Sequence, residues 1–289
     1  MEIYPLGLVL ASAFIHVFWN MLMKSSQDKL VFMGWVFLFS SLFYFPFFGA
    51  NLHRLPIPLT GWALIWISGF IHVVYTIILA KAYEAGDLSL VYPLARSAPL
   101  FVTLWAVLFL GERLTVGGVM GILLVVVGAY MIGFRTPQWR EFTKPLFSLK
   151  DKPYQLALLT ALLVSLYSIV DKIGVSRMHP FIFYYLLLVP RLTLYVPYVF
   201  MTRHPSIMPE WRRNRRNILL VALLQFLGYL LILYAMTLTK VSYIVAIRQI
   251  SVVFAVLMGT AVLKEKYGFV RLVASAFIFL GVFLIGVKG

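Results

Sequence analysis

Cysteine is absent from this sequence of 289 residues, and only 12% of its residues are charged. Without cysteine the chain has neither a disulfide framework nor a thiolate metal site. A soluble domain carries about 25% charged residues, so the few charges here cannot cover a surface that faces water. These absences exclude a disulfide-rich secreted scaffold, a disordered chain and an ordinary cytosolic enzyme.

Acidic residues are also scarce, with 10 Asp and Glu against 25 Lys and Arg, which gives a net charge of +15. A balance this basic raises the question of nucleic acid, but a nucleic-acid binder gathers its basic residues on one folded face. Here most of them lie in short gaps between apolar runs, where they attract lipid headgroups and set topology. We therefore expect a lipid bilayer as a partner and no nucleic acid.

Catalytic motifs are missing as well. The chain has no phosphate-cradling G-x-x-x-x-G-K-[ST] sequence, no G-x-S-x-G elbow and no H-E-x-x-H. Its 5 histidines do not have metal-ligand spacing. We expect no enzymatic activity, no cofactor, no metal, and no transport powered by ATP hydrolysis within this chain.

What the sequence has in abundance is apolar residues, at 62%. They fall into ten runs, each long enough to cross a bilayer as a helix of about 20 residues. The N-terminal run lacks the basic start of a cleavable signal and is followed by many more. The sequence thus predicts an all-α integral membrane protein, multi-pass in the plasma (inner) membrane. The runs lie at about 4–23, 31–50, 61–82, 89–110, 116–134, 154–176, 181–201, 217–238, 242–263 and 268–287.

The chain also repeats itself. Residues 82–133, moved forward by 153 positions, fall on 235–286 without a gap, and Glu112 then coincides with Glu265. Each glutamate ends an apolar run and precedes a basic residue. We expect one membrane domain, 1–289, with a first repeat at 1–134, a connecting loop at 135–153 and a second repeat at 154–289. Because five helices per repeat is an odd number, the halves are inverted, as in transporters that rock about a central site.

The most specific segment runs from Gly86 to Leu94 as GDLSLVYPL, followed by Gly111-Glu112-Arg113-Leu114 and a glycine-studded helix. This segment resembles the drug/metabolite transporter superfamily, and within it the EamA-type ten-helix exporters. The second copy, Lys264-Glu265-Lys266, is similar but degraded. The resemblance implies a central cavity walled by helices 1–4 and 6–9, with helices 5 and 10 as outer supports.

Ionisable side chains inside a membrane are costly and tend to mark a pathway. Arg96, Arg191 and Arg248 lie within predicted helices 4, 7 and 9. Pro93 and Pro99 flank Arg96 and Pro190 precedes Arg191, so we expect broken helices there. A site with three arginines and one aspartate is positive, which favours a carboxylate or phosphate over a lipophilic cation. The predicted substrate-binding residues are Arg96, Arg191, Arg248, Gln249, Tyr92, Tyr195, His16, Trp19, Asn20 and His72.

Four further charged residues have other predicted roles. Asp171 is the one acid well inside a helix and is followed by Lys172, so this pair is a candidate for proton coupling or for an internal ion pair. Glu112 and Glu265 stand at helix ends and are candidates for gate or interface residues. On helix 5, Gly117, Gly121 and Gly128 form a stripe that permits close packing, within the monomer rather than in a dimer.

Together these features predict a secondary transporter that exports a small anionic or zwitterionic metabolite, such as an amino acid or organic acid, by alternating access. Two alternatives stay open: a carrier of sugar phosphates, phosphonates or lipid intermediates, and a membrane-embedded enzyme or scaffold. Two arguments about the orientation of the chain in the membrane, the charge count and the resemblance, disagree. Sixteen basic residues fall on one side of the membrane and six on the other, which places both termini outside the cytoplasm, whereas the resemblance favours both inside.

Overall fold

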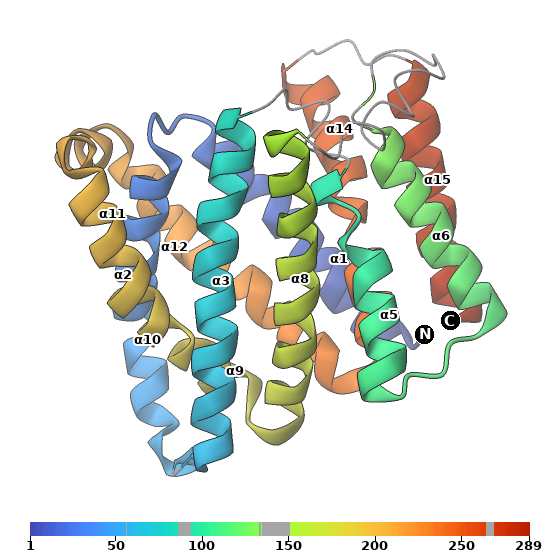
Figure 1. The fold of residues 1–289 in the computed structure, drawn as a ribbon, viewed down its shortest axis with the longest axis horizontal. Helices are drawn as coiled ribbons and strands as arrows, with labels where there is room; N and C mark the ends of the chain where they lie inside the picture. Colours follow the sequence, from blue (N-terminus) through green and yellow to red (C-terminus); the bar gives the residue numbers. More distant parts are fainter. Residues whose placement is uncertain (56, 86–93, 133, 135–150, 264–268) are drawn as a thin grey trace.

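The computed structural model describes residues 1–55, 57–85, 94–132, 134, 151–263 and 269–289. Within these residues the regular structure is helical throughout, and the helices stand side by side in one bundle (Figure 1). Seven of the described helical segments are long and apolar enough to cross a membrane, and three shorter apolar helices accompany them. The predicted all-α membrane fold is therefore confirmed.

Within the described residues, each half of the chain contributes helices of five crossings. The first half contains α1 (Ile3–Met23), α2 (Lys29–Ala50), η1 (Leu52–Arg54), α3 (Leu59–Ala85), α5 (Ala98–Leu110) and α6 (Val116–Met131). The second half contains α8 (Lys152–Arg177), α9 (Pro180–Leu186), α10 (Leu188–Pro190), η2 (Arg191–Tyr195), α11 (Val196–Thr202), η3 (His204–Ser206), α12 (Ile207–Leu238), α13 (Val241–Ile247), α14 (Ile250–Leu263) and α15 (Phe269–Lys288). The segments α9, α10, η2 and α11 make the seventh crossing, and α13 with α14 makes the ninth.

The packing of the helices follows the repeat. The first and third crossings, α1 and α3, correspond to α8 and α12 in the second half. The strongest contacts between the halves include α3 with α8 and α1 with α12, which are the same contact seen from each half. The contacts of α5 with α8 and of α1 with α14 form a second equivalent pair. The architecture is thus two inverted five-helix repeats.

The fifth and tenth crossings, α6 and α15, lie together at one edge of the bundle (Figure 1). A methyl group added at Gly121 would lie 2.7 Å from the carbonyl oxygen of Gly281, and one at Gly128 would lie 2.6 Å from that of Ala274. Only glycine lets two backbones approach this closely. The glycine stripe therefore packs within the chain, as expected.

Both ends of the chain lie on the same side of the bundle. The amino group of Met1 donates a hydrogen bond to the carbonyl oxygen of Gly286, at 2.9 Å. An even number of crossings requires this arrangement.

One connection differs from the expectation. A loop was predicted at about 202–216, but α12 begins at Ile207. Its first turns are amphipathic, because Ile207, Glu210 and Asn214 are buried while the four arginines at 212, 213, 215 and 216 are exposed. Glu210 accepts hydrogen bonds from the backbone of Gln27 and Asp28, at 3.1 and 3.2 Å. These contacts stabilise the polar turns of α12 that precede the apolar run at 217–238.

Candidate functional site

Three crossings are interrupted near their polar residues. The helix of the fourth crossing turns at 96–97 before α5, and that of the ninth turns at 248–249 between α13 and α14. In the seventh crossing, the five residues after Pro190 form a π-helical turn, η2. The breaks beside Arg96 and Arg191 were predicted from the neighbouring prolines. The ninth crossing breaks without a proline.

Two of these breaks touch each other. Arg96 Nη1 donates a hydrogen bond to Gln249 Oε1, at 3.0 Å. With the repeat shift of 153 residues, Arg96 and Gln249 are equivalent positions. The contact therefore lies where the two halves meet about their pseudo-two-fold axis, which is where an inverted-repeat transporter holds its substrate.

Arg248, the neighbour of Gln249, lies beside a small polar cavity. Its guanidinium carbon lies 5.4 Å from the centre of the Tyr229 ring. The cavity has a volume of about 20 Å³, which is room for about one water molecule. Its walls are Ser12, His16, Trp19, Gln225, Gly228, Tyr229 and Arg248. The site is therefore closed to anything larger in this conformation.

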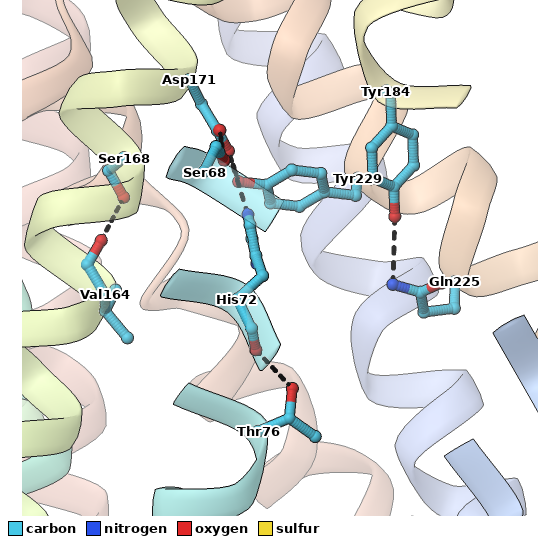
Figure 2. A network of polar contacts seen from close by, with 9 residues as sticks. All are labelled: Ser68, His72, Thr76, Val164, Ser168, Asp171, Tyr184, Gln225 and Tyr229. Carbon is cyan, nitrogen blue, oxygen red and sulfur yellow. Dashed lines mark hydrogen bonds and ion pairs between the residues drawn. The ribbon is translucent and has the colours of Figure 1, made fainter. Parts of the chain in front are cut away.

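Behind Tyr229 lies a network centred on Asp171, whose side chain is fully buried (Figure 2). Ser68 donates to its Oδ1, and Tyr229 donates to its Oδ2 at 2.5 Å. His72 Nε2 lies 3.2 Å from the same Oδ2. A buried carboxylate is tolerated only when such partners replace its hydration, and here helices α3, α8 and α12 each contribute.

Aromatic rings fix the geometry of this network. The His72 imidazole stacks on Tyr167 with ring centres 4.0 Å apart, and meets Tyr229 edge to face at 5.6 Å. Tyr75 packs edge to face against Tyr167, with ring centres 5.5 Å apart. The imidazole is thus held with its Nε2 aimed at the carboxylate.

Arg191 is the most deeply buried of the three arginines, at 4% exposure. Its guanidinium lies over the rings of Phe37 and Tyr184, 5.2 and 5.3 Å from their centres. Its Nη1 is buried without a hydrogen-bond partner. On the other side of Tyr184, Gln225 Nε2 donates to the phenol oxygen at 3.1 Å, while Gln225 Oε1 is also buried without a partner (Figure 2).

The residues expected on helix 1 make two kinds of contact. His16 and Trp19 line the small cavity and meet edge to face, with ring centres 5.0 Å apart. The side-chain amide of Asn20 instead donates to the His16 carbonyl oxygen of its own helix, at 2.6 Å.

Of the two expected tyrosines, Tyr195 does not line the small cavity. Tyr195 donates to the Leu30 carbonyl oxygen at 3.0 Å and packs on Phe37. Phe37 in turn contacts the Arg191 guanidinium, so Tyr195 contributes to the packing around Arg191. Tyr92, the other, lies outside the described residues, as does Glu265.

Asp171 and Lys172 do not pair with each other. Lys172 turns toward the end of α12, where its ammonium donates to the carbonyl oxygens of Met236 and of Thr239, the latter at 3.0 Å. These are last-turn carbonyls that lack helical partners. Lys172 therefore caps α12, and Asp171 instead contacts the imidazole of His72.

Glu112 joins the two halves on the side where the termini lie. Its carboxylate accepts from the backbone N–H of Val241, at 2.7 Å, and from the Ser242 hydroxyl, at 2.5 Å. It thus caps the start of α13 from the other half of the chain. Beside it lies an open vestibule of about 490 Å³, lined by Leu110, Glu112, Lys172, Ile173, Ser176, Thr237, Leu238, Thr239 and Lys240.

Among the residues of this site that were not predicted are Ser68, Tyr184, Gln225 and Tyr229. Gln225 had a signal, because the repeat places it at the position of His72. Ser68 lies one turn before His72, and Tyr229 one turn after Gln225, so each shares a helix face with its neighbour. Tyr184 had no comparable signal.

Comparisons with known proteins agree with this architecture. No curated protein matches the chain. A solved structure, titled only "Crystal structure of protein", superimposes with a TM-score of 0.75 at 16% sequence identity, covering 97% of this chain and 96% of that one. That likeness concerns the fold. The model of the EamA-like transporter family matches residues 4–134 and 152–287. The chain therefore belongs to the EamA-like transporter family and is a multi-pass membrane transporter of small molecules.

Proposed function

We propose that this protein is a secondary transporter that exports a small anionic or zwitterionic metabolite, an amino acid or an organic acid, by alternating access of its two halves. The observation that carries the proposal is the contact of Arg96 with Gln249 where two broken helices meet, with Arg248 in the same turn as Gln249. Outward direction rests on the resemblance to exporters.

The charge of the site supports an anionic group on the substrate. Among the described residues within the apolar spans, Arg96, Arg191 and Arg248 contribute three guanidinium groups, against the one carboxylate of Asp171. A low-dielectric surrounding strengthens the preference for a negative ligand. Arginine also offers a fork of donors that suits a carboxylate or phosphate. The small multidrug members of the superfamily, by contrast, depend on a glutamate in helix 1, and α1 has no acid within its span.

Alternating access is supported by the equivalence of the contacts between halves. The contacts of α3 with α8 and of α1 with α12 are related by the repeat. Loosening one contact while tightening the other therefore changes the side of the membrane to which the site opens. The cavity beside Arg248 holds about one water molecule at about 20 Å³. A substrate therefore requires the halves to move apart on one side.

Reconstituted liposomes test the proposal. We expect the purified chain to release trapped amino acids or organic anions, and Arg96→Ala or Arg191→Ala to weaken substrate binding. Arg203→Ala, at an exposed residue paired with Glu84 across 3.3 Å, is the matched control and keeps normal flux. The proposal fails if both interior variants bind substrate as the parent does, if the site binds quaternary ammonium compounds, or if folded protein moves no candidate.

A further inference from the structure

The first turns of α12 carry a basic face. Arg212, Arg213, Arg215 and Arg216 are exposed, and none of them pairs with a carboxylate among the residues that the structure describes. Glu210 is the one acid of α12, and it is turned inward at 3% exposure. Four guanidinium groups so close together attract a negative partner from outside the chain.

The rotation of this segment about its axis is fixed by contacts on the opposite face. Asn214 donates to Glu210 Oε1 at 2.8 Å, and its Oδ1 accepts from the Ser25 hydroxyl, also at 2.8 Å. Beside them, Trp211 stacks on Phe39 with ring centres 5.0 Å apart. Since the buried side of the helix is held in this way, its arginines point away from the bundle.

The arginines lie at the depth of the lipid headgroups. The 32 residues of α12 span about 48 Å, whereas the hydrocarbon core is about 30 Å thick. The apolar run starts at 217, directly after Arg216, and Arg212 lies about 6 Å further out along the helix. Because the headgroup layer on each side is about 5–8 Å thick, all four arginines fall within it.

Toward the middle of the membrane, the same face of α12 is apolar and exposed. Leu220, Leu223 and Leu227 are 48, 42 and 41% exposed. Together with Arg212 and Arg216 they follow one another at intervals of four, four, three and four residues, which places all five along one face of the helix. A phospholipid has the same order, a charged phosphate followed by an apolar chain.

The repeat provides an internal comparison, because α3 is the equivalent helix of the first half. Phe70, which corresponds to Leu223, is 57% exposed, so α3 also has an apolar outer surface. It lacks the charges at its start, however. The positions equivalent to the four arginines hold Leu59, Thr60, Trp62 and Ala63. A lipid-facing helix of this fold therefore does not require arginines, and the basic face is a feature of the second half alone.

We propose that the outer face of α12 is a binding site for an anionic phospholipid. Its phosphate contacts Arg212 and Arg216, and its acyl chain lies along the three exposed leucines. Arginine offers a fork of donors that suits a phosphate, and residues four apart on a helix are neighbours, at about 5–6 Å between their Cβ atoms. Arg213 and Arg215, on either side of this pair, face neighbouring headgroups.

The leucines favour a lipid over an acidic protein. A protein segment outside the membrane could reach the arginines, but it could not cover leucines that lie within the hydrocarbon core. The opposite face of the same helix contributes Gln225, Gly228 and Tyr229 to the wall of the small cavity. A lipid at this site thus binds the outer side of a helix whose inner side belongs to the candidate transport site.

Fluorescence quenching by brominated lipids tests the site directly. Because the chain has no cysteine, the full-length variant Leu223→Cys takes a single bimane label. It is reconstituted in phosphatidylcholine liposomes that contain equal fractions of brominated phosphatidylglycerol or brominated phosphatidylcholine in both leaflets, so the orientation of the protein does not matter. We expect the anionic lipid to bind more strongly, by about fivefold for each arginine that contacts its phosphate. Equal quenching by the two lipids overturns the proposal.

Matched variants assign the preference to the arginines. Adding Arg212→Gln and Arg216→Gln to the labelled chain should abolish it. Adding Lys29→Gln and Lys81→Gln, which removes two exposed charges elsewhere on the same side, should leave it unchanged. In the unaltered background, a label at Phe70→Cys should be quenched equally by both lipids. A preference that survives loss of the two arginines, or an equal preference at Phe70→Cys, contradicts the site.

Three further measurements separate the lipid from other partners. Raising the salt concentration should weaken the preference at Leu223→Cys, since salt screens exposed charges. Neither glycerol 3-phosphate nor a polyglutamate peptide should displace the brominated phosphatidylglycerol. Displacement by the first would indicate a site for a free phosphate ester, and displacement by the second would indicate an acidic protein partner. Quenching that disappears as the protein-to-lipid ratio rises would show that a second copy of the chain covers the leucines. Each of these three results, or a preference insensitive to salt, overturns the proposal, and the proposed transport function does not depend on the outcome.

Discussion

Arg96 and Gln249 occupy the same position in the two halves of the chain, and their side chains meet, with Nη1 3.0 Å from Oε1. A contact between equivalent residues can form only on the axis that relates the halves. Here both residues also lie in turns that interrupt their helices. The functional site is thus built from one repeated feature, a broken helix, in which the two copies carry different side chains.

This relationship predicts the behaviour of a side-chain exchange. Arg96→Gln removes the guanidinium, and Gln249→Arg places two guanidinium groups together, so each single variant should bind substrate more weakly. The double variant restores one arginine and one glutamine across the axis. We expect it to recover part of the lost affinity, in a double-mutant cycle measured by ligand-induced thermal shift. Strictly additive losses would show that the contact has no role in binding.

A second prediction concerns the shape of the Arg191 side chain. Arg191→Lys keeps the charge but replaces the planar fork by a single ammonium. A hydrogen bond to a charged group contributes about 1.5–3 kcal/mol, so we expect binding of the substrate to weaken by about 10- to 100-fold. The exposed variant Arg203→Lys serves as the control. Unchanged affinity in Arg191→Lys would mean that only its charge matters.

Part of this site could be predicted, because prolines and the residues related by the repeat are identified directly in the sequence. Pro190 predicted the break beside Arg191, which is a π-helical turn. The repeat shift of 153 places Gln225 at the position of His72, but Gln225 was not among the predicted residues. The break at 248–249 has no proline and no glycine. Its neighbours are helix-compatible residues, so only the packing of α13 against other helices determines it.

Only part of the Asp171 network could be predicted from the sequence. Burial of the aspartate was expected from its place in an apolar helix, but its partners come from α3 and α12, and nothing in the sequence sets the rotation of those helices about their axes. For Lys172, adjacency to Asp171 suggested an ion pair. Consecutive residues point in different directions on a helix, and the lysine instead reaches the carbonyl groups at the end of α12.

The capping role of Lys172 predicts an effect on stability. Lys172→Met keeps much of the side-chain length but removes the donors to Met236 and Thr239. A cation at a partly buried helix C-terminus contributes up to about 2 kcal/mol, so the variant should unfold at a lower temperature. Lys172→Arg should retain most of the stability.

The contact between α6 and α15 predicts opposite results for two glycine substitutions. At Gly121 an added methyl group would lie 2.7 Å from the Gly281 carbonyl oxygen, whereas at Gly7 nothing lies within 4 Å. Gly121→Ala should therefore destabilise the chain by about 1–3 kcal/mol through overpacking. Gly7→Ala, in the second turn of α1, should be neutral or stabilising because alanine favours helix. Thermal unfolding in detergent distinguishes them, and equal stability of the two variants would contradict the close approach.

The last prediction concerns the direction in which the chain crosses the membrane. Both termini lie on one side, since Met1 contacts Gly286, and the six-residue basic set at 54, 113, 172, 177, 240 and 288 belongs to that side. Of these, Lys172 is already engaged in capping α12. The order of the apolar runs in the sequence assigns sixteen basic residues to the opposite side, among them the exposed arginines at the start of α12. Because basic residues near helix ends are retained in the cytoplasm, we expect the termini outside it.

A C-terminal alkaline phosphatase fusion, which is active only outside the cytoplasm, should then be active, and a C-terminal green fluorescent protein fusion should be dark. Replacing the arginines at 212, 213, 215 and 216 by glutamine should lower the phosphatase signal, because it removes four of the sixteen retained charges. A fluorescent, phosphatase-inactive C-terminus would instead support the orientation that the family resemblance favours.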